Sequence, residues 1–171
     1  QQLLSGGTGG LGLLTGRWLG ETGAASLVLA ARGGKVAAAD AAKLNKLPKC
    51  VVRVVRCDVA ERTDTRCVLA AMLCDGGARL AGVWHAAGVL SDGLLHSQTA
   101  QTFKRVFAPK AFGGWSLQAA CVSAPLQAMV FFSSVAALLG GAGQSNYSAA
   151  NCCLDATSAM RRAYGQAASS V

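Results

Sequence analysis

The chain has 171 residues, of which 52% are hydrophobic and 14% are charged. This length is typical of one domain, and so low a charge excludes an intrinsically disordered protein. Basic residues outnumber acidic ones by 16 to 8, so the formal net charge is +8. The basic residues between positions 35 and 56 are not interleaved with aromatic side chains. We therefore expect no nucleic-acid partner, and we attribute the positive charge to a polyanionic cofactor or an acidic protein partner.

Cysteine usage and the longest uncharged stretch indicate where the protein works. The seven cysteines include no Cys-x-x-Cys pair, and there are only two histidines, so neither a disulfide framework nor a metal site is expected. We expect free, buried cysteines in a reducing compartment, the cytoplasm. No charged residue occurs from Ala111 to Leu154, but glycines, Pro125 and polar residues divide this stretch into pieces too short to span a bilayer. It is predicted to be buried core, with no membrane association.

Strand-like and helix-like segments alternate along the chain. Apolar strands are expected at 3–4, 26–31, 50–57, 80–85 and 129–133. Helices are expected at 11–19 (with an apolar stripe of Leu11, Leu14 and Trp18), 36–47 (stopped by Pro48), 63–73 (followed by Gly76 and Gly77), 98–120 and 145–164. This alternation predicts right-handed βαβ units, and so an α/β fold with a doubly wound parallel sheet and helices on both faces. Residues 1–171 are expected to form a single domain.

Three features suggest that this sheet is of the Rossmann type and binds a dinucleotide. The run from Ser5 to Gly12 is Ser-Gly-Gly-Thr-Gly-Gly-Leu-Gly, placed between a strand and a helix, where glycines let the backbone approach a pyrophosphate. Arg32 ends the second strand, where an arginine suits the 2′-phosphate of NADP. Asp58 ends the third strand, where a carboxylate can accept a hydrogen bond from adenine. Each has a structural alternative: an ordinary glycine turn, a solvated arginine and a turn-capping aspartate.

Four polar residues further along the chain form a possible catalytic set. Ser134 follows the fifth strand, Tyr147 lies on the last helix, and Asn151 is four residues later on the same helix face. Lys110 lies at the start of the uncharged stretch, where a buried ammonium needs a partner. A cation near a phenol favours the phenolate, which suits proton transfer. Each residue alone could be structural, but their combination downstream of the glycine loop favours an enzyme.

With these motifs the chain resembles the catalytic part of a ketoreductase domain from a type I polyketide synthase or an animal-type fatty acid synthase, in the short-chain dehydrogenase/reductase superfamily. The similarity extends over nearly the whole chain, through the glycine loop, Leu-Val-Leu-Ala-Ala-Arg, Cys-Asp-Val, His-Ala-Ala-Gly and the segment from Phe131 to Asn151. Most members of the superfamily have the active-site lysine four residues after the tyrosine. Here that position is Asn151 and the lysine is Lys110, an exchange that resembles the synthase ketoreductases specifically.

The resemblance implies a role for each residue of the catalytic set. Tyr147 would be the general acid that protonates the β-keto oxygen, and Ser134 would hydrogen-bond the same oxygen. Lys110 would hold and acidify Tyr147, and Asn151 would complete the network. The cofactor NADPH would contact the phosphate loop, Arg32, the adenine-side pair and the nicotinamide-ribose side, namely Gly6, Gly7, Thr8, Gly10, Leu11, Gly12, Arg32, Asp58, Val59, Ala87 and Gly88.

The implied reaction is reduction of a β-ketoacyl thioester to a β-hydroxyacyl thioester. The substrate would be carried on the phosphopantetheine arm of an acyl carrier domain, and the chain would be a catalytic segment of a multidomain synthase with neighbouring synthase domains. The family associates a Leu-Asp-Asp signature with 3R products. Leu90-Ser91-Asp92 keeps its second aspartate, and Leu139 stands where synthases of the opposite hand often have tryptophan, so a 3R product is expected. Two departures are Ala31, where the family usually has serine, and Ser5, where threonine is common.

Two other functions remain open from the sequence. One is a free-standing short-chain reductase acting on a small carbonyl compound. The other is a catalytically silent module that binds cofactor or serves only as structure. The presence of all four residues of the catalytic set argues against the silent module.

Overall fold

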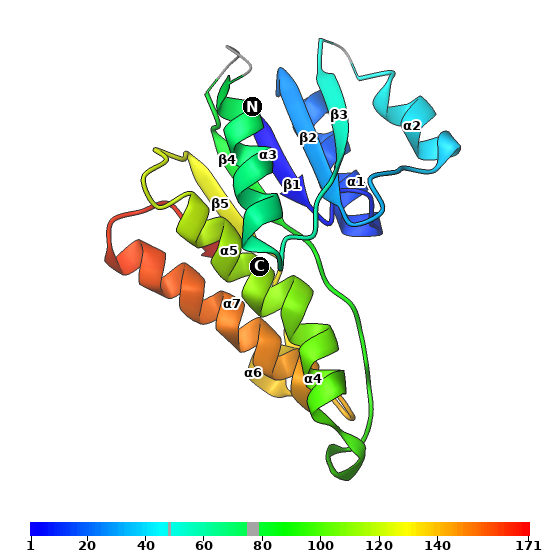
Figure 1. The fold of residues 1–171 in the computed structure, drawn as a ribbon, viewed down its shortest axis with the longest axis vertical. Helices are drawn as coiled ribbons and strands as arrows, with labels where there is room; N and C mark the ends of the chain where they lie inside the picture. Colours follow the sequence, from blue (N-terminus) through cyan, green and yellow to red (C-terminus); the bar gives the residue numbers. More distant parts are fainter. Residues whose placement is uncertain (48, 75–78) are drawn as a thin grey trace.

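The computed structural model describes residues 1–47, 49–74 and 79–171. Its centre is a parallel six-stranded sheet in the order β3-β2-β1-β4-β5-β6 (Figure 1). The strands are β1 (Gln2–Ser5), β2 (Ser26–Ala31), β3 (Val51–Arg56), β4 (Gly82–His85), β5 (Ala128–Phe131) and β6 (Ser169–Ser170). The five predicted strands are confirmed. The sixth was not predicted, because two serines carry no apolar pattern.

The helices follow the predicted alternation, with corrections to their bounds. They are α1 (Gly10–Glu21), α2 (Ala38–Leu44), α3 (Arg62–Cys74), the 3-10 turn η1 (Leu95–Ser97), α4 (Ala100–Phe107), the π-helical turn η2 (Ala108–Phe112), α5 (Gly113–Ala120), α6 (Ala136–Leu139) and α7 (Ser145–Ala163). The single helix expected at 98–120 is therefore two α-helices joined by a wide π turn. The second predicted helix is shorter than expected, and α6 was not predicted. Pro48, Gly76 and Gly77, which were expected to end helices, lie outside the described residues.

Alternate residues of the strands pack on opposite faces of the sheet, as the pleat requires. On one face, Leu3 and Val28 join a core completed by Leu69 of α3, Leu117 of α5 and Leu154 of α7. On the other face, neighbouring residues of β1 and β2 pack against α1, the end of α2 and the segment after it: Leu4, Leu27 and Leu29 with Leu19, Leu44 and Leu47. Figure 1 shows α3, α5 and α7 in front of the sheet and α1 behind it. The predicted doubly wound sheet with helices on both faces is confirmed.

The apolar stripe that the sequence shows on α1 is not the buried face of the helix. Leu11, Leu14 and Trp18 are 57%, 65% and 52% exposed. The buried residues are instead three glycines spaced four apart and one leucine: Gly12, Gly16, Gly20 and Leu19. Glycines let the helix axis approach the sheet closely, so the helix contacts the leucines of β1 and β2 with its backbone. The side chains of Leu11, Leu14 and Trp18 consequently lie on the more exposed side of the helix.

The cysteines are less buried than expected, and the uncharged stretch is core only in part, since Val135, Leu138 and Leu139 are 68%, 84% and 77% exposed. All seven cysteines are free thiols; Cys57 and Cys121 are buried, but the pairs 67/74 and 152/153 are exposed. Met129 and Phe131, in the uncharged stretch, are 1% and 0% exposed. Within the described ranges, every helix is too short or too polar to cross a bilayer.

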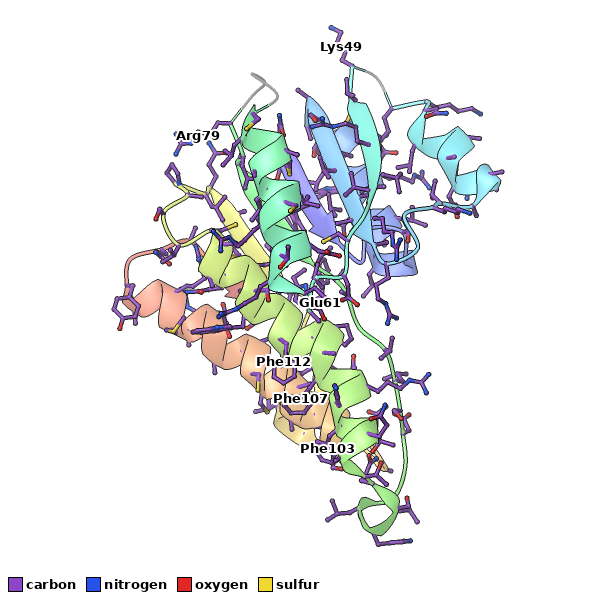
Figure 2. All side chains as sticks on the ribbon, viewed as in Figure 1. Lys49, Glu61, Arg79, Phe103, Phe107 and Phe112 are labelled. Carbon is purple, nitrogen blue, oxygen red and sulfur yellow. The ribbon has the colours of Figure 1, made fainter. Side chains whose placement is uncertain are left out.

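Aromatic side chains follow one another along α4 and the π turn. The ring centroids of Phe103 and Phe107 are 5.9 Å apart, and those of Phe107 and Phe112 are 6.3 Å apart (Figure 2). These contacts stack the end of α4 on the π turn, so the aromatic series continues across the change in helical winding.

Candidate active site

The carboxyl ends of four neighbouring strands open into a cleft of about 340 Å³. Parallel α/β sheets bind ligands at this edge, where the strand order reverses. Seven of the residues expected to bind cofactor line the cleft: Gly6, Thr8, Arg32, Asp58, Val59, Ala87 and Gly88. The lining also includes residues to which the sequence assigned no cofactor contact: Gly9, Ala31, Gly33, Cys57, Ala86, Val89 and Pro109.

The glycine loop divides into residues that face the cleft and residues that pack beneath it. Gly6 has a φ of 67°, and a Cβ on it would lie 2.6 Å from the backbone nitrogen of Ala87. A Cβ on Gly7 would lie 2.8 Å from Cα of Leu29, and one on Gly12 would overlap the carbonyl oxygen of Gly6. Gly7 therefore allows the loop to pack on β2, Gly12 allows α1 to pack on the loop, and neither residue lines the cleft. Gly10 and Leu11 form the exposed first turn of α1 and lie outside the lining as well.

Asp58 and Arg32 both line the cleft, but Asp58 is hydrogen-bonded to its own turn whereas Arg32 is exposed. The carboxylate of Asp58 accepts a hydrogen bond from the Ala60 N–H (3.1 Å), and the Asp58 N–H donates to Asp64 (2.9 Å). Asp58 thus serves as a turn cap, the alternative left open from the sequence, and also lines the cleft. Arg32 is exposed at the end of β2, so its guanidinium is available to a phosphate.

Lys110, Tyr147 and Asn151 are brought together in the interior. Lys110 lies in the π turn and is 5% exposed. Its Nζ donates to Oδ1 of Asn151 (2.7 Å) and to the carbonyl of Phe132 (3.0 Å), and it lies 5.0 Å from the centroid of the Tyr147 ring. The Asn151 amide donates in turn to the carbonyl of Tyr147 (2.9 Å). The buried ammonium therefore has the partner that the sequence required.

Burial sets the protonation of this lysine. It lowers the pKa of Lys110 from the ordinary value of 10.5 to about 8, and the carboxylate of Asp155 opposes the shift. Asp155 is four residues after Asn151 on the same helix. An ammonium whose pKa is close to neutrality can hold a phenol and also respond to its ionisation.

Ser134 lies three residues after β5, at the start of α6. Its hydroxyl oxygen accepts from the Ala136 N–H (3.2 Å). Helix α6 packs against α7, which carries Tyr147. Since the hydroxyl accepts from the backbone, its own proton is available for a carbonyl oxygen.

His85 and the Phe132 carbonyl belong to the site but were not expected to. His85 is fully buried at the end of β4. Its Nδ1 lies 2.6 Å from Oγ of Ser5, and its Nε2 lies 2.9 Å from the carbonyl oxygen of Lys110. Burial lowers the pKa of His85 to about 4, so the ring is neutral. In the sequence, the only indication of a role for His85 was its place at the end of an apolar strand. Its contact with Lys110, 25 residues later in the chain, depends on how the π turn packs on the end of the sheet.

The loop bearing Asp92 is hydrogen-bonded to the segment before α7. Gln144 donates to Asp92 (3.2 Å), Gly93 N–H donates to the Gly143 carbonyl (2.8 Å), and Asn146 donates to the Ser91 carbonyl (2.8 Å). These two segments line a groove of about 320 Å³, whose lining also includes Ser145 and Ser148 of α7. Leu139 is 77% exposed and is the last residue of α6, directly before Gly140 and Gly141, which line this groove.

The chain is similar to domains of very large synthases. The model of the KR domain family matches residues 1–171. The spectinabilin polyketide synthase system protein NorB of Streptomyces orinoci is 45% identical over 95% of this chain and 8% of its own length. The polyketide synthase GfsA of Streptomyces halstedii is 43% identical over 99% of this chain and 2% of its own length. The chain therefore spans less than a tenth of either relative.

Solved structures of other proteins have the same fold as this chain. An A1-type ketoreductase is 38% identical, with a TM-score of 0.90 over 99% of this chain and 36% of that chain. The ketoreductase from the first module of phoslactomycin biosynthesis in Streptomyces sp. HK803 is 34% identical, with a TM-score of 0.91 over 99% of this chain and 40% of that chain. Levodione reductase, at 23% identity and a TM-score of 0.84, shares the fold.

Proposed function

Because the chain belongs to the KR domain family, the ketoreductase domains of polyketide synthases, we propose that it reduces a β-ketoacyl thioester to a β-hydroxyacyl thioester with NADPH. The observation that carries this proposal is that the cleft ends at the buried cluster. Gly88 lines the cleft, and a Cβ on it would lie 3.0 Å from Cε of Lys110. One end of a ligand in the cleft would thus lie beside Lys110, whose ammonium lies over the Tyr147 ring.

Domains of this family bind a nicotinamide cofactor, and the residues present fit one. The loop at Gly6 packs closely on the backbone of Ala87, because Gly6 has no side chain to collide with it, and in that position Gly6 lines the cleft. The N-terminal amides of α1 favour an anion at the same point. Arg32 suits a 2′-phosphate, which favours NADPH over NADH, and Asp58 suits the adenine amine. When bound, the cofactor would supply a hydride to the ketone carbon.

The side chains of this protein would supply the proton. We assign Tyr147 as the general acid that protonates the ketone oxygen from its phenolic hydroxyl, so that C=O becomes CH–OH. Ser134 would donate a hydrogen bond to the same oxygen and orient it. Lys110 would stabilise the phenolate left behind, since its ammonium is held over the ring by Asn151 and the Phe132 carbonyl.

The partner would be an acyl carrier domain whose phosphopantetheine arm delivers the substrate, with other synthase domains as neighbours. The lengths of the relatives support this context, since each is many times longer than the region matched. They also favour it over a free-standing reductase. We further propose a cytoplasmic location, as expected for seven free thiols.

The test is a steady-state assay of the full-length protein, with NADPH and a β-ketoacyl thioester or trans-1-decalone as substrate. Wild-type protein should turn over, and Tyr147→Phe should lower kcat by about 10²-fold or more, as expected for loss of a general acid. The Phe ring keeps the packing, so NADPH binding should be retained. A wild-type protein that binds NADPH without turnover would support the silent module instead.

A further inference from the structure

The helix that carries Lys110 changes its winding at that residue. Between α4 and α5 the π turn at 108–112 widens the helix, and the N–H of Gly113 points to the carbonyls of both Ala108 and Lys110. Pro109, at the start of the turn, has no N–H to contribute. Such turns are rare and cluster at functional sites, because they shift the direction of the side chains that follow. The position of Lys110 therefore depends on what holds this turn.

His85 contacts the backbone of the turn directly. Its Nε2 lies 2.9 Å from the Lys110 carbonyl oxygen, which can only accept, so Nε2 must carry the proton. In the neutral ring Nδ1 is then the acceptor, and the Ser5 hydroxyl donates to it over 2.6 Å. Both ring nitrogens are thereby satisfied in one tautomer. The ring joins the end of β1, the end of β4 and the π turn.

Two glycines give the helix room to approach this ring. A Cβ on Gly113 would lie 3.2 Å from Cε1 of His85 and 2.7 Å from Cγ2 of Val59. A Cβ on Gly114 would lie 3.5 Å from Cδ2 of His85 and 2.7 Å from Cδ2 of Leu154. Glycine destabilises a helix interior by about 1 kcal/mol relative to alanine. Consecutive glycines here are thus explained by the close packing of the helix on His85 and its neighbours.

We propose that His85 is a positioning residue that sets the active-site lysine through the hydrogen bond from Nε2 to the Lys110 carbonyl. The side-chain end of Lys110 is held by Asn151 and Phe132, as described above, and its backbone end is held by His85. Without His85 the Lys110 carbonyl would keep the Gly113 N–H as a donor, but the π turn could relax and move Nζ away from the Tyr147 ring. This proposal rests on the proposed function, because it assigns Lys110 a part in the reduction.

Two amide substitutions separate the hydrogen bonds of His85. In His85→Gln the side-chain amide reaches the position of Nε2 and can still donate to the Lys110 carbonyl. In His85→Asn the shorter amide reaches only the position of Nδ1, next to Ser5. We expect His85→Gln to keep kcat within about fivefold of wild type and His85→Asn to lower it about 30-fold, since displacement of a catalytic group by about 1 Å can cost 10²-fold. The KM for the thioester and the Kd for NADPH should change less than about twofold in both.

The measurement is made on the full-length protein, with kcat normalised to the amount of bound NADPH so that unfolded protein does not contribute. His85→Phe keeps a ring but cannot donate, and it replaces His85→Asn if that variant does not fold; it should also lose about 30-fold in kcat. Equal kcat values in the Gln variant and the non-donating variant would overturn the proposal, as would a loss confined to NADPH affinity. Wild-type protein without turnover would contradict the proposed function itself, whatever the variants do.

Discussion

At the scale of single residues, the site is built around one buried cation. Lys110 makes its contacts with an amide, a backbone carbonyl and an aromatic ring, and within the described residues no carboxylate touches it. Asp155 acts on it from one helical turn beyond Asn151. The charge of this lysine is therefore sensitive to pH near neutrality.

The pH dependence of reduction should report this lysine. Its pKa is about 8, so the ammonium is present below pH 8 and loses its proton as the pH rises through that value. We expect kcat for ketone reduction to fall on the alkaline side with a midpoint near this value. Asp155→Asn removes the carboxylate that raises the pKa of Lys110, so its alkaline limb should move to lower pH. An unchanged limb, or one moved to higher pH, in a variant of normal melting temperature would contradict this account.

Cofactor choice is a second property set by one residue. Arg32→Ala should weaken NADPH binding by roughly 1.5–3 kcal/mol, the range for a hydrogen bond between charged groups. NADH lacks the 2′-phosphate, so its affinity should stay within about twofold. Fluorescence titration of wild type and variant with both cofactors measures the difference. Equal losses for the two cofactors would show that Arg32 has only a structural role.

At the scale of elements, glycines decide how the helices meet the sheet. In α1 they replace the leucine stripe that would ordinarily face the core. Gly12 lies under the phosphate loop, where a Cβ would overlap the Gly6 carbonyl, whereas a Cβ on Gly16 would be 3.4 Å from the Leu29 side chain, an ordinary contact. The same residue type is thus required at one position of the helix and replaceable one turn later.

Alanine substitutions at these two positions should have opposite signs. Gly16→Ala should raise the free energy of unfolding by about 0.5–1 kcal/mol, because alanine favours the helix and meets no clash. Gly12→Ala should lower it by about 2 kcal/mol or more and weaken NADPH binding, because the backbone of the loop would have to move. Urea denaturation of both variants measures the change. Destabilisation by both would show that α1 cannot accommodate a methyl group anywhere on its buried face.

At the scale of the whole molecule, segments from different parts of the chain line the groove by which we propose that the substrate enters. The loop at Asp92 and the segment before α7 are hydrogen-bonded across about 50 positions of sequence, and the groove between them is also lined by Ser145 and Ser148 of α7, the helix that carries Tyr147. A thioester arm that entered from this side would present one face of the ketone to the cofactor. Selectivity of about 100-fold needs only about 2.7 kcal/mol between the two transition states.

We expect the product to be predominantly the 3R alcohol, because Asp92 is retained and Leu139 replaces the tryptophan associated with the opposite hand. Chiral chromatography of the product from a β-ketoacyl thioester gives the configuration. Asp92→Ala should reduce the enantiomeric excess, since it loses the hydrogen bond from Gln144, while Tyr147 is untouched. A predominantly 3S product from the wild-type protein would contradict the prediction.

The sequence by itself predicted five of the six strands, the parallel sheet, the glycine loop and a candidate catalytic set. These follow from local patterns: apolar runs, helical spacing, and polar residues at strand ends. Helix α7 alone places Tyr147 and Asn151 on one face, so their proximity needed no tertiary information.

Only the tertiary structure decided which face of α1 is buried, which cysteines are exposed and what holds Lys110. Hydrophobic spacing identifies a stripe, but a helix packs by the fit of its surface, and glycines fit closer than leucines do. His85, Ser5 and Lys110 come from three separate elements and meet because β1 and β4 are neighbours while the π turn passes over their ends. Contacts of this kind depend on distances across the sheet, which no local pattern in the chain encodes.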